Sequence, residues 1–213
     1  CACDAWSIDA ARDGRLMVGA AGAIHVSHDR GDRWRRTAVT GRVVGVACDP
    51  GQPRHMFAAI EPHGVWHSDD GGARFAPVAT MPEPRGVAVA GPGTIAVGAT
   101  GALRGAPGGP FAVAADQACH AVAVALDAPD LVFVGAERAL LRSRTEVLHL
   151  QAVELPAPLA GPVTAVALAP GDRCRIAAVT ARGQLVYSVD CCTHWHITQL
   201  PAHAAPAHAL AIT

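Results

Sequence analysis

An eight-residue pattern recurs along the chain and constrains its fold more than any other feature: Ser, any residue, Asp, any residue, Gly, two further residues and an aromatic. Two copies are complete, at 27–34 and 68–75, and a third, at 188–195, has Cys192 in the place of Gly. The defining residues are Ser27, Asp29, Gly31 and Trp34, then Ser68, Asp70, Gly72 and Phe75, and finally Ser188, Asp190 and Trp195. An Asp accepts hydrogen bonds from backbone N–H groups of its own turn, and Gly adopts positive φ where a hairpin reverses. The pattern therefore predicts three similar hairpin turns, each closed by a packed aromatic ring.

Short Val- and Ala-rich runs, bounded by turn residues, fill the segments between these turns. In the first unit they lie at 5–10, 16–20, 22–27 and 35–39. Such runs favour strands, and no segment has a convincing helical period. The places equivalent to Ser27 fall at 27, 68, 104, 143 and 188. The unit thus recurs at roughly 40 residues, which is the length of a four-stranded propeller blade.

The sequence therefore predicts an all-β fold, a β-propeller of about five four-stranded blades in a single domain over 1–213. The blades are expected at approximately 5–39, 43–79, 86–114, 121–153 and 163–200. The segment 207–213 matches the first strand of a sixth unit. Two interpretations of it stay open: it adds to a blade as a clasp that closes the ring, or the chain is part of a larger propeller.

The eight-residue pattern resembles the Asp-box, or BNR repeat, of sialidase-like and related β-propellers. In those families the boxes lie on outer hairpins away from the functional face, so the resemblance implies a structural role for Asp29, Asp70 and Asp190. In repeat type the chain is also similar to the BNR-containing assembly factors of photosystem II and to other envelope propellers. Those relatives imply a non-catalytic, protein-binding role.

Catalytic chemistry finds little support in the sequence. A sialidase needs an arginine cluster, a Tyr nucleophile beside a Glu, and an acid–base Asp. Tyr187 is the one Tyr, and it stands in a predicted strand directly before Ser188. There is no Gly-x-Ser-x-Gly elbow and no phosphate-binding Gly loop. We therefore expect no catalytic residues and no cofactor, and a non-catalytic scaffold, accessory subunit or assembly factor. The alternative is a glycan-binding or sialidase-type glycoside-hydrolase-like protein.

Four residues near the third turn are candidates for binding a metal ion: Cys191, Cys192, His194 and His196. Thiolate and imidazole are ligands that zinc and copper accept. His194 and His196 share one face of a strand, but two adjacent cysteines at a turn point in different directions. The spacing therefore argues against a preformed metal site, and disulfide bonding or surface placement is the alternative.

Arginines gather at the first turn and recur at the second: Arg30, Arg33, Arg35, Arg36 and Arg74. The formal net charge of −1 argues against a general nucleic-acid binder. Arg and Trp often anchor protein interfaces, so the hypothesis is a basic, aromatic surface that contacts another protein or a membrane complex. A solvated hairpin is the alternative.

The first residue is Cys1, as in a mature bacterial lipoprotein after signal cleavage. Seven cysteines would fit one lipidated Cys1 and three disulfides among the other six. A fragment with reduced thiols is the alternative. No apolar run reaches transmembrane length. These features predict a bacterial cell-envelope location, periplasmic or extracellular, with a lipid anchor at Cys1.

Overall fold

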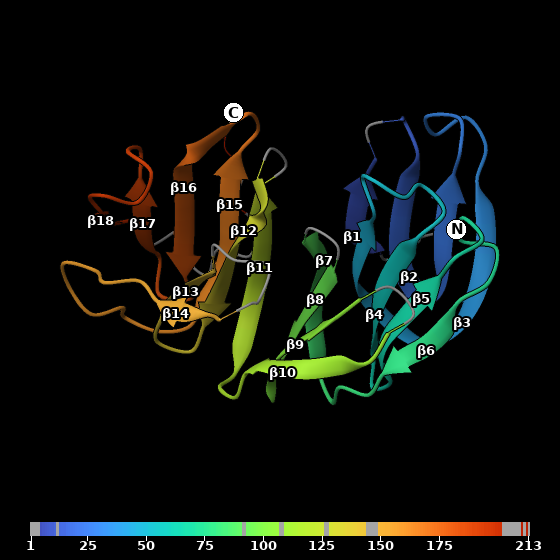
Figure 1. Cartoon of the computed structure of the whole chain (residues 1–213), viewed down its shortest axis with the longest axis horizontal. Coiled ribbons are helices and arrows are strands. Elements are labelled where there is room, and N and C mark those ends of the chain that lie inside the picture. Colours follow the sequence, from blue (N-terminus) through green and yellow to red (C-terminus); the bar gives the residue numbers. More distant parts are fainter. Residues whose placement is uncertain are drawn as a thin grey trace.

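A computed structural model describes residues 5–11, 13–90, 93–106, 109–125, 128–143, 149–201, 210 and 212. All regular elements in this part of the chain are β-strands. They form antiparallel sheets that are arranged as successive blades of a ring (Figure 1). The predicted fold class, an all-β propeller of about five four-stranded blades, is confirmed.

The first six strands form one hydrogen-bonded sheet that supplies two blades. They are β1 (Ala5–Ala10), β2 (Leu16–Ser27), β3 (Arg35–Cys48), β4 (Met56–Glu61), β5 (Gly64–Ser68) and β6 (Ala76–Ala79). Strand β2 covers the predicted strands 16–20 and 22–27, and β3 runs from the predicted strand 35–39 into the start of the second predicted blade at 43. The first half of β3 pairs with β2 and its second half pairs with β4. Strand β3 therefore carries the chain from the first blade into the second without a loop.

The remaining strands form three separate four-stranded sheets, each antiparallel and in chain order. The third blade contains β7 (Pro84–Ala90), β8 (Gly93–Gly98), β9 (Gly101–Gly105) and β10 (Phe111–Ala115). The fourth contains β11 (Cys119–Ala125), β12 (Ala128–Ala136), β13 (Leu140–Ser143) and β14 (Gln151–Ala152). The fifth contains β15 (Val163–Ala169), β16 (Asp172–Thr180), β17 (Gln184–Ser188) and β18 (His196–Gln199). The predicted strand at 207–213 lies outside the described residues, apart from Leu210 and Ile212, which belong to no strand.

Four buried apolar clusters hold the blades together, each between two successive blades. Strand β4 shows how the alternation of side chains produces them, because successive residues of a strand point to opposite faces. Met56 and Ile60 pack in the cluster between the first and second blades, whereas Phe57 packs in the cluster between the second and third. Burial of apolar surface on both faces therefore stabilises the stack of sheets.

Small residues allow the inner edges of the blades to approach closely. In β3, a Cβ atom at Gly45 would lie 3.0 Å from Gly86 Cα and 3.0 Å from Val87 N in β7. Only Gly accommodates this backbone contact without displacing one of the two strands. A residue without a side chain at this position thus follows from the close approach of the two inner strands.

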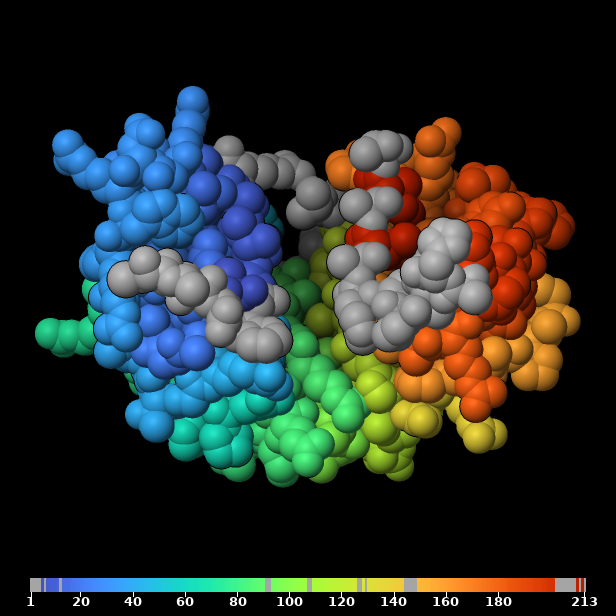
Figure 2. All heavy atoms as spheres, turned by 180° about the vertical axis from the view of Figure 1, so that it is seen from behind, coloured from blue at the N-terminus to red at the C-terminus, as the bar shows by residue number. Residues whose placement is uncertain are grey.

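The inner strands of the five blades are β1, the second half of β3, β7, β11 and β15, and each contacts the next along the chain. In Figure 2 the first two blades, in blue to teal, and the fifth, in orange to red, lie on opposite sides of the molecule. Atoms of the third blade, in green, and of the fourth, in yellow-green to yellow, lie between them. Among the described residues no helix has the length and apolarity needed to cross a membrane.

Candidate functional site

The three Ser–Asp turns share one hydrogen-bond pattern. In each, the Ser hydroxyl donates to the Asp carboxylate, and the residue four positions after the Ser donates its backbone N–H to the Ser oxygen. The Oγ–Oδ1 distances are 2.9 Å for Ser27–Asp29, 2.8 Å for Ser68–Asp70 and 2.9 Å for Ser188–Asp190. The N–Oγ distances are 2.8 Å for Gly31, 2.9 Å for Gly72 and 3.1 Å for Cys192. The turns therefore have the same conformation.

Each carboxylate also accepts a backbone N–H from the residue four positions after it. The donors are Arg33 at 2.8 Å, Arg74 at 3.0 Å and His194 at 2.9 Å. These backbone bonds are the largest cause of the lowered pKa of Asp29, Asp70 and Asp190. An acid–base catalyst needs a raised or matched pKa, so charged carboxylates held in their own turns are unsuited to that task.

Cys192 adopts the backbone conformation that Gly adopts in the other two turns. Its φ is +68°, compared with +99° at Gly31 and +83° at Gly72. A side chain disfavours this left-handed region, so the third turn keeps its shape at an energetic cost. Its neighbour Cys191 forms a disulfide with Cys174, which ties the turn to β16.

In the described part of the chain one disulfide forms, Cys174–Cys191, rather than the three that the count allowed. Cys48, Cys119 and Cys192 are thiols, and the first two are buried on the inner strands β3 and β11. Burial, and then the nearby Asp9 carboxylate, raises the pKa of Cys48 to about 12. Burial raises the pKa of Cys119 to about 11. These two thiols are therefore inert at neutral pH.

The four candidate metal ligands are not brought together. Cys191 is consumed by its disulfide, and Cys192 packs against the apolar cluster between the fourth and fifth blades. His194 Nδ1 lies 2.6 Å from Asp190 Oδ2, and His196 stacks on Tyr187. In the described part of the chain no three His, Cys, Asp or Glu side chains gather in a way that could hold a metal ion.

A histidine pair that the sequence did not indicate lies in the second blade. His55 Nδ1 and His67 Nε2 are 3.0 Å apart, and the ring of His67 stacks on Phe57. Burial, and then the neighbouring His55, lowers the pKa of His67. One of the two nitrogens must carry a proton to make this hydrogen bond.

The five arginines are all exposed, and two of them bond to backbone. Arg35 Nη2 donates to Gly71 O at 2.8 Å, so it ties the first blade to the turn of the second. Arg36 Nη2 donates to Gly22 O at 3.4 Å. Among the described residues, the side chains of Arg30, Arg33 and Arg74 donate no hydrogen bond, and Arg33 and Arg74 donate only through their backbone N–H. The grouping at the first turn is therefore present, and its role as a partner surface stays a prediction.

The inner strands carry a repeated feature that sequence reasoning missed: each has a β-bulge at the same place in its unit. The register with the next strand shifts between Ala5 and Ser7, Val43 and Gly45, Pro84 and Gly86, Cys119 and Ala121, and Val163 and Ala165. The residues passed over are Trp6, Val44, Arg85, His120 and Thr164. The bulges fall at the same place in each unit, so these five backbone positions form an equivalent set around the axis.

A cavity of about 290 Å³, which we call the bulge-end cavity, opens among the starts of all five inner strands. Arg85, His120 and Thr164 line it together with Ser7, and the remaining walls are Val, Gly, Ala and Leu210. The Ser7 hydroxyl accepts the backbone N–H of Val46 at 3.1 Å. The polar side chains therefore sit at one end of the ring axis.

Arg85 and His120 of this cavity form a hydrogen-bonded chain with Glu137, which lies outside the cavity wall. Arg85 Nη1 lies 2.6 Å from His120 Nδ1, and His120 Nε2 lies 2.9 Å from Glu137 Oε2. A guanidinium can only donate, so Nδ1 accepts and the Nε2–H donates to the carboxylate. The Nε2–H tautomer of His120 satisfies both bonds, and the imidazole links the third blade to the fourth.

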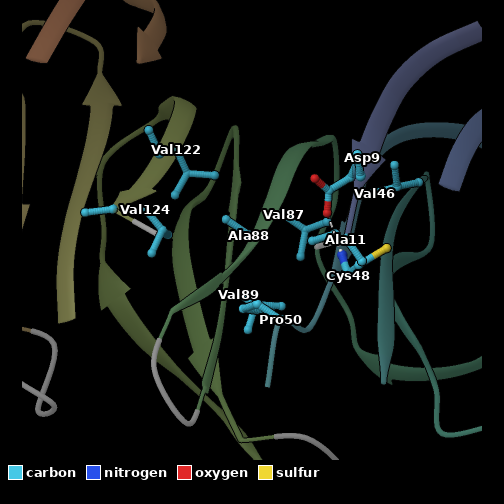
Figure 3. Close-up of a pocket in the computed structure, with 14 residues that line it drawn as sticks. Asp9, Ala11, Val46, Cys48, Pro50, Val87, Ala88, Val89, Val122 and Val124 are labelled. Atoms are coloured by element: carbon cyan, nitrogen blue, oxygen red, sulfur yellow. Dashed lines mark hydrogen bonds between the residues drawn. The ribbon is translucent and has the colours of Figure 1, made fainter. Parts of the chain in front are cut away.

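Farther along the axis, a second cavity of about 350 Å³, which we call the apolar cavity, is lined by β1, β3, β7 and β11 (Figure 3). Val87 and Val122 border both cavities. Asp9 is the carboxylate in its wall, and Asp9 Oδ2 accepts the Cys48 N–H at 2.7 Å. The two cavities therefore differ in chemistry: one contains a guanidinium, and the other is almost entirely aliphatic.

No protein-family model and no curated protein matches the sequence. Several solved structures share the fold. The chain superposes on a glycoside hydrolase family 74 xyloglucanase from Xanthomonas campestris with a TM-score of 0.74 and 19% identity, covering 96% of this chain and 41% of that one. It superposes on a chain of the mitotic checkpoint complex with a TM-score of 0.76 and 14% identity, covering 99% and 69%. For YCF48 bound to a D1 peptide the values are 0.64, 12%, 92% and 66%.

These likenesses show that the class of protein is a β-propeller. The chain spans about two fifths of the length of the xyloglucanase that it matches. The matched proteins include both glycoside hydrolases and propellers in complexes, so a role follows from the site rather than from the fold.

Proposed function

We propose that this propeller is a non-catalytic protein-binding scaffold or accessory subunit of the cell envelope, and that its working surface is the hairpin of the first turn. The observation that carries the proposal is Trp34. The rings at the equivalent positions, Phe75 and Trp195, pack against apolar clusters, whereas Trp34 is 43% exposed. An exposed Trp among arginines has the composition of an interface anchor.

The surroundings of Trp34 support this assignment. Its Nε1 donates to Gly31 O at 2.9 Å, which fixes the ring while its face stays exposed. Beside it lies a hollow of about 210 Å³ bordered by Val18, Ala20 and His25. A fixed aromatic ring next to an apolar hollow loses little conformational entropy on binding. The exposed arginines of the same hairpin would add charge attraction toward an acidic partner.

The arrangement of carboxylates supports the absence of glycoside hydrolysis. That reaction uses two carboxyl groups that face each other across the substrate. In the two axial cavities, among the residues that the structure describes, Asp9 is the carboxylate in the wall, and it is bonded to backbone. We further assign the three Ser–Asp turns to the Asp-box type with a structural role, because their carboxylates bond within their own turns.

The test uses envelope membranes of the source organism, solubilised in mild detergent, and the immobilised protein. The variant Trp34→Ala/Arg33→Glu removes the ring and reverses one charge while Arg35, which bonds to Gly71, stays in place. Arg182→Glu, an exposed arginine of the fifth blade, is the control. A partner retained by the parent and the control but lost by the double variant supports the proposal. Equal retention of the partner by all three proteins would show that the Trp34 hairpin is not the binding surface. Hydrolysis of xyloglucan oligosaccharides by the parent would contradict the non-catalytic role.

An envelope location through a lipid at Cys1 is part of the same proposal, although Cys1 lies outside the described residues. Mass spectrometry of the protein isolated from its own membranes measures it. We expect acyl mass on Cys1, and an unmodified Cys1 in the membrane-isolated protein would contradict the anchor.

A further inference from the structure

The guanidinium of Arg85 in the bulge-end cavity has N–H groups without a hydrogen-bond partner among the described residues. In the part of the chain that the structure describes, Arg85 has one partner, His120, and that bond uses Nη1. A guanidinium has five N–H donors in a planar fork. The remaining donors of Arg85 are therefore available at the cavity, where the side chain is half-buried.

Two features position this guanidinium: the bulge in its own strand and the hydrogen bond to His120. Its strand is displaced by the bulge between Pro84 and Gly86, which takes Arg85 out of the ladder. His120, displaced by the equivalent bulge of β11, accepts from Nη1, and Glu137 holds the imidazole from its far side. A cation held in this way loses little side-chain freedom when a ligand arrives.

We propose that the bulge-end cavity binds a small monocarboxylate with an apolar body, and that Arg85 is the group that receives the carboxylate. The planar fork of Arg matches a carboxylate in a bidentate arrangement. The cavity wall supplies one cationic side chain, so a monoanion is matched in charge and a phosphate dianion is not. The other polar groups in the wall are the imidazole of His120 and the hydroxyls of Ser7 and Thr164.

The apolar part of the wall selects the rest of the ligand. Four blades each contribute one valine to the cavity wall: Val44, Val87, Val122 and Val166. Leu210 adds a further aliphatic side chain. At about 290 Å³ the cavity is at the small end of the range for ligand sites, which favours a short aliphatic chain. This site is separate from the Trp34 surface and does not depend on it.

The test is titration of the whole protein with pentanoate, followed by amide NMR shifts and calorimetry. We expect saturable binding at millimolar concentration, with the largest shifts at the cavity backbone of Gly45, Gly86 and Ala121. The neutral analogue 1-pentanol should bind at least about tenfold more weakly, because it lacks the charged carboxylate that Arg85 recognises. Inorganic phosphate should bind at least about tenfold more weakly for want of a second cation.

Variants separate recognition by Arg85 from general stability. Arg85→Gln should abolish saturable pentanoate binding, and Arg85→Lys should weaken it at least about tenfold, because Lys keeps the charge but lacks the fork. Arg104→Gln, which removes an arginine from β9 of the same blade, is the matched control and should bind as the parent does. Thermal melts followed by circular dichroism test whether each variant is folded.

Several results would overturn the assignment. Unchanged pentanoate binding by folded Arg85→Gln would remove Arg85 as the receptor, and shifts confined to residues outside the cavity would place the ligand elsewhere. Equal affinity for 1-pentanol would make the cavity an apolar site without charge recognition. Equal affinity for phosphate would make it a general anion site. Absence of saturable binding of pentanoate by the parent would remove the proposal altogether.

Discussion

Arg85 Nη1 on β7 lies 2.6 Å from His120 Nδ1 on β11, so the inner strands of two neighbouring blades are joined by a hydrogen bond between side chains. Both residues occupy the bulge position of their strand. A hydrogen bond from a charged group contributes more than one between neutral groups. The same bond therefore couples the third blade to the fourth and orients a cation at the ring axis.

The second Ser–Asp turn should depend on its carboxylate. Asp70→Ala removes the acceptor for the Arg74 N–H and for the hydroxyl of buried Ser68. We expect the free energy of unfolding to fall by about 1–2 kcal/mol, because these donors lose their partner. Urea denaturation measures it. Asp69→Ala, one residue earlier and exposed, is the control, and equal losses in the two variants would contradict the assigned role.

Stability should decrease in acid because of the lowered Asp pKa values. The model-compound pKa is 3.8, and that of folded Asp70 lies below it, with the Arg74 N–H as the largest cause. The stabilisation is therefore present above pH 3.8 and is lost as the pH falls through the folded pKa. Thermal melts between about pH 2 and 6 measure this dependence. The melting temperature of Asp70→Asn, which cannot ionise, should fall less steeply with decreasing pH than that of the parent. An equal slope in the two proteins would contradict the role given to the Asp70 carboxylate.

Two glycines with the same backbone conformation should differ in their tolerance of Ala. At Gly31 a Cβ would lie 3.4 Å from Leu16 Cδ1, an ordinary contact, so Gly31→Ala carries mainly the cost of positive φ, about 1–2 kcal/mol. At Gly72 a Cβ would lie 2.7 Å from Val26 Cγ2 in the core. Gly72→Ala should cost about 1–3 kcal/mol more, because of overpacking. Urea denaturation of the two variants compares them, and a smaller loss at Gly72 would refute the packing argument.

The buried thiols should resist alkylation in the native state. With a pKa of about 12 for Cys48 and about 11 for Cys119, the reactive thiolate is scarce at pH 8. Iodoacetamide followed by peptide mass spectrometry should label these two residues only after denaturation. Cys192, which is partly exposed, is the internal comparison. Rapid native labelling of Cys48 would show that the inner strands open readily.

Much of the fold follows from the sequence because its signals are local. Turn chemistry and the alternation of side chains within short runs located most strands, and Asp29, Asp70 and Asp190 accept the bonds expected of turn residues. The continuity of β3 was not predicted. Gly41, which looks like a turn residue between two strands, lies within β3 with a φ of +109°.

The polar end of the axis was missed for a specific reason. The predicted inner strands of the third and fourth blades began at Gly86 and Ala121, one residue after Arg85 and His120. A polar residue before an apolar run resembles the end of a loop, and the register of a β-bulge depends on the partner strand. The equivalence of these positions can be found in the sequence by aligning the five units at Ser7, Gly45, Gly86, Ala121 and Ala165. The residues that precede them, Arg85 and His120 included, then occupy the same position of the repeat.

The continuous strand β3 also determines where the chain could be opened. A new pair of termini is tolerated at exposed loops, where few backbone hydrogen bonds are lost. Between the second and third blades an unpaired connection exists, at 80–83, in which Met81 is buried and its neighbours are exposed. Between the first and second blades the connection is itself paired, to β2 and then to β4. A circular permutant cut at 82–83, between two exposed residues, would keep every ladder, whereas one cut at 40–41 would divide a strand that belongs to two blades. We therefore expect the first two blades to unfold together, and the first connection between blades that is free of strand pairing follows β6.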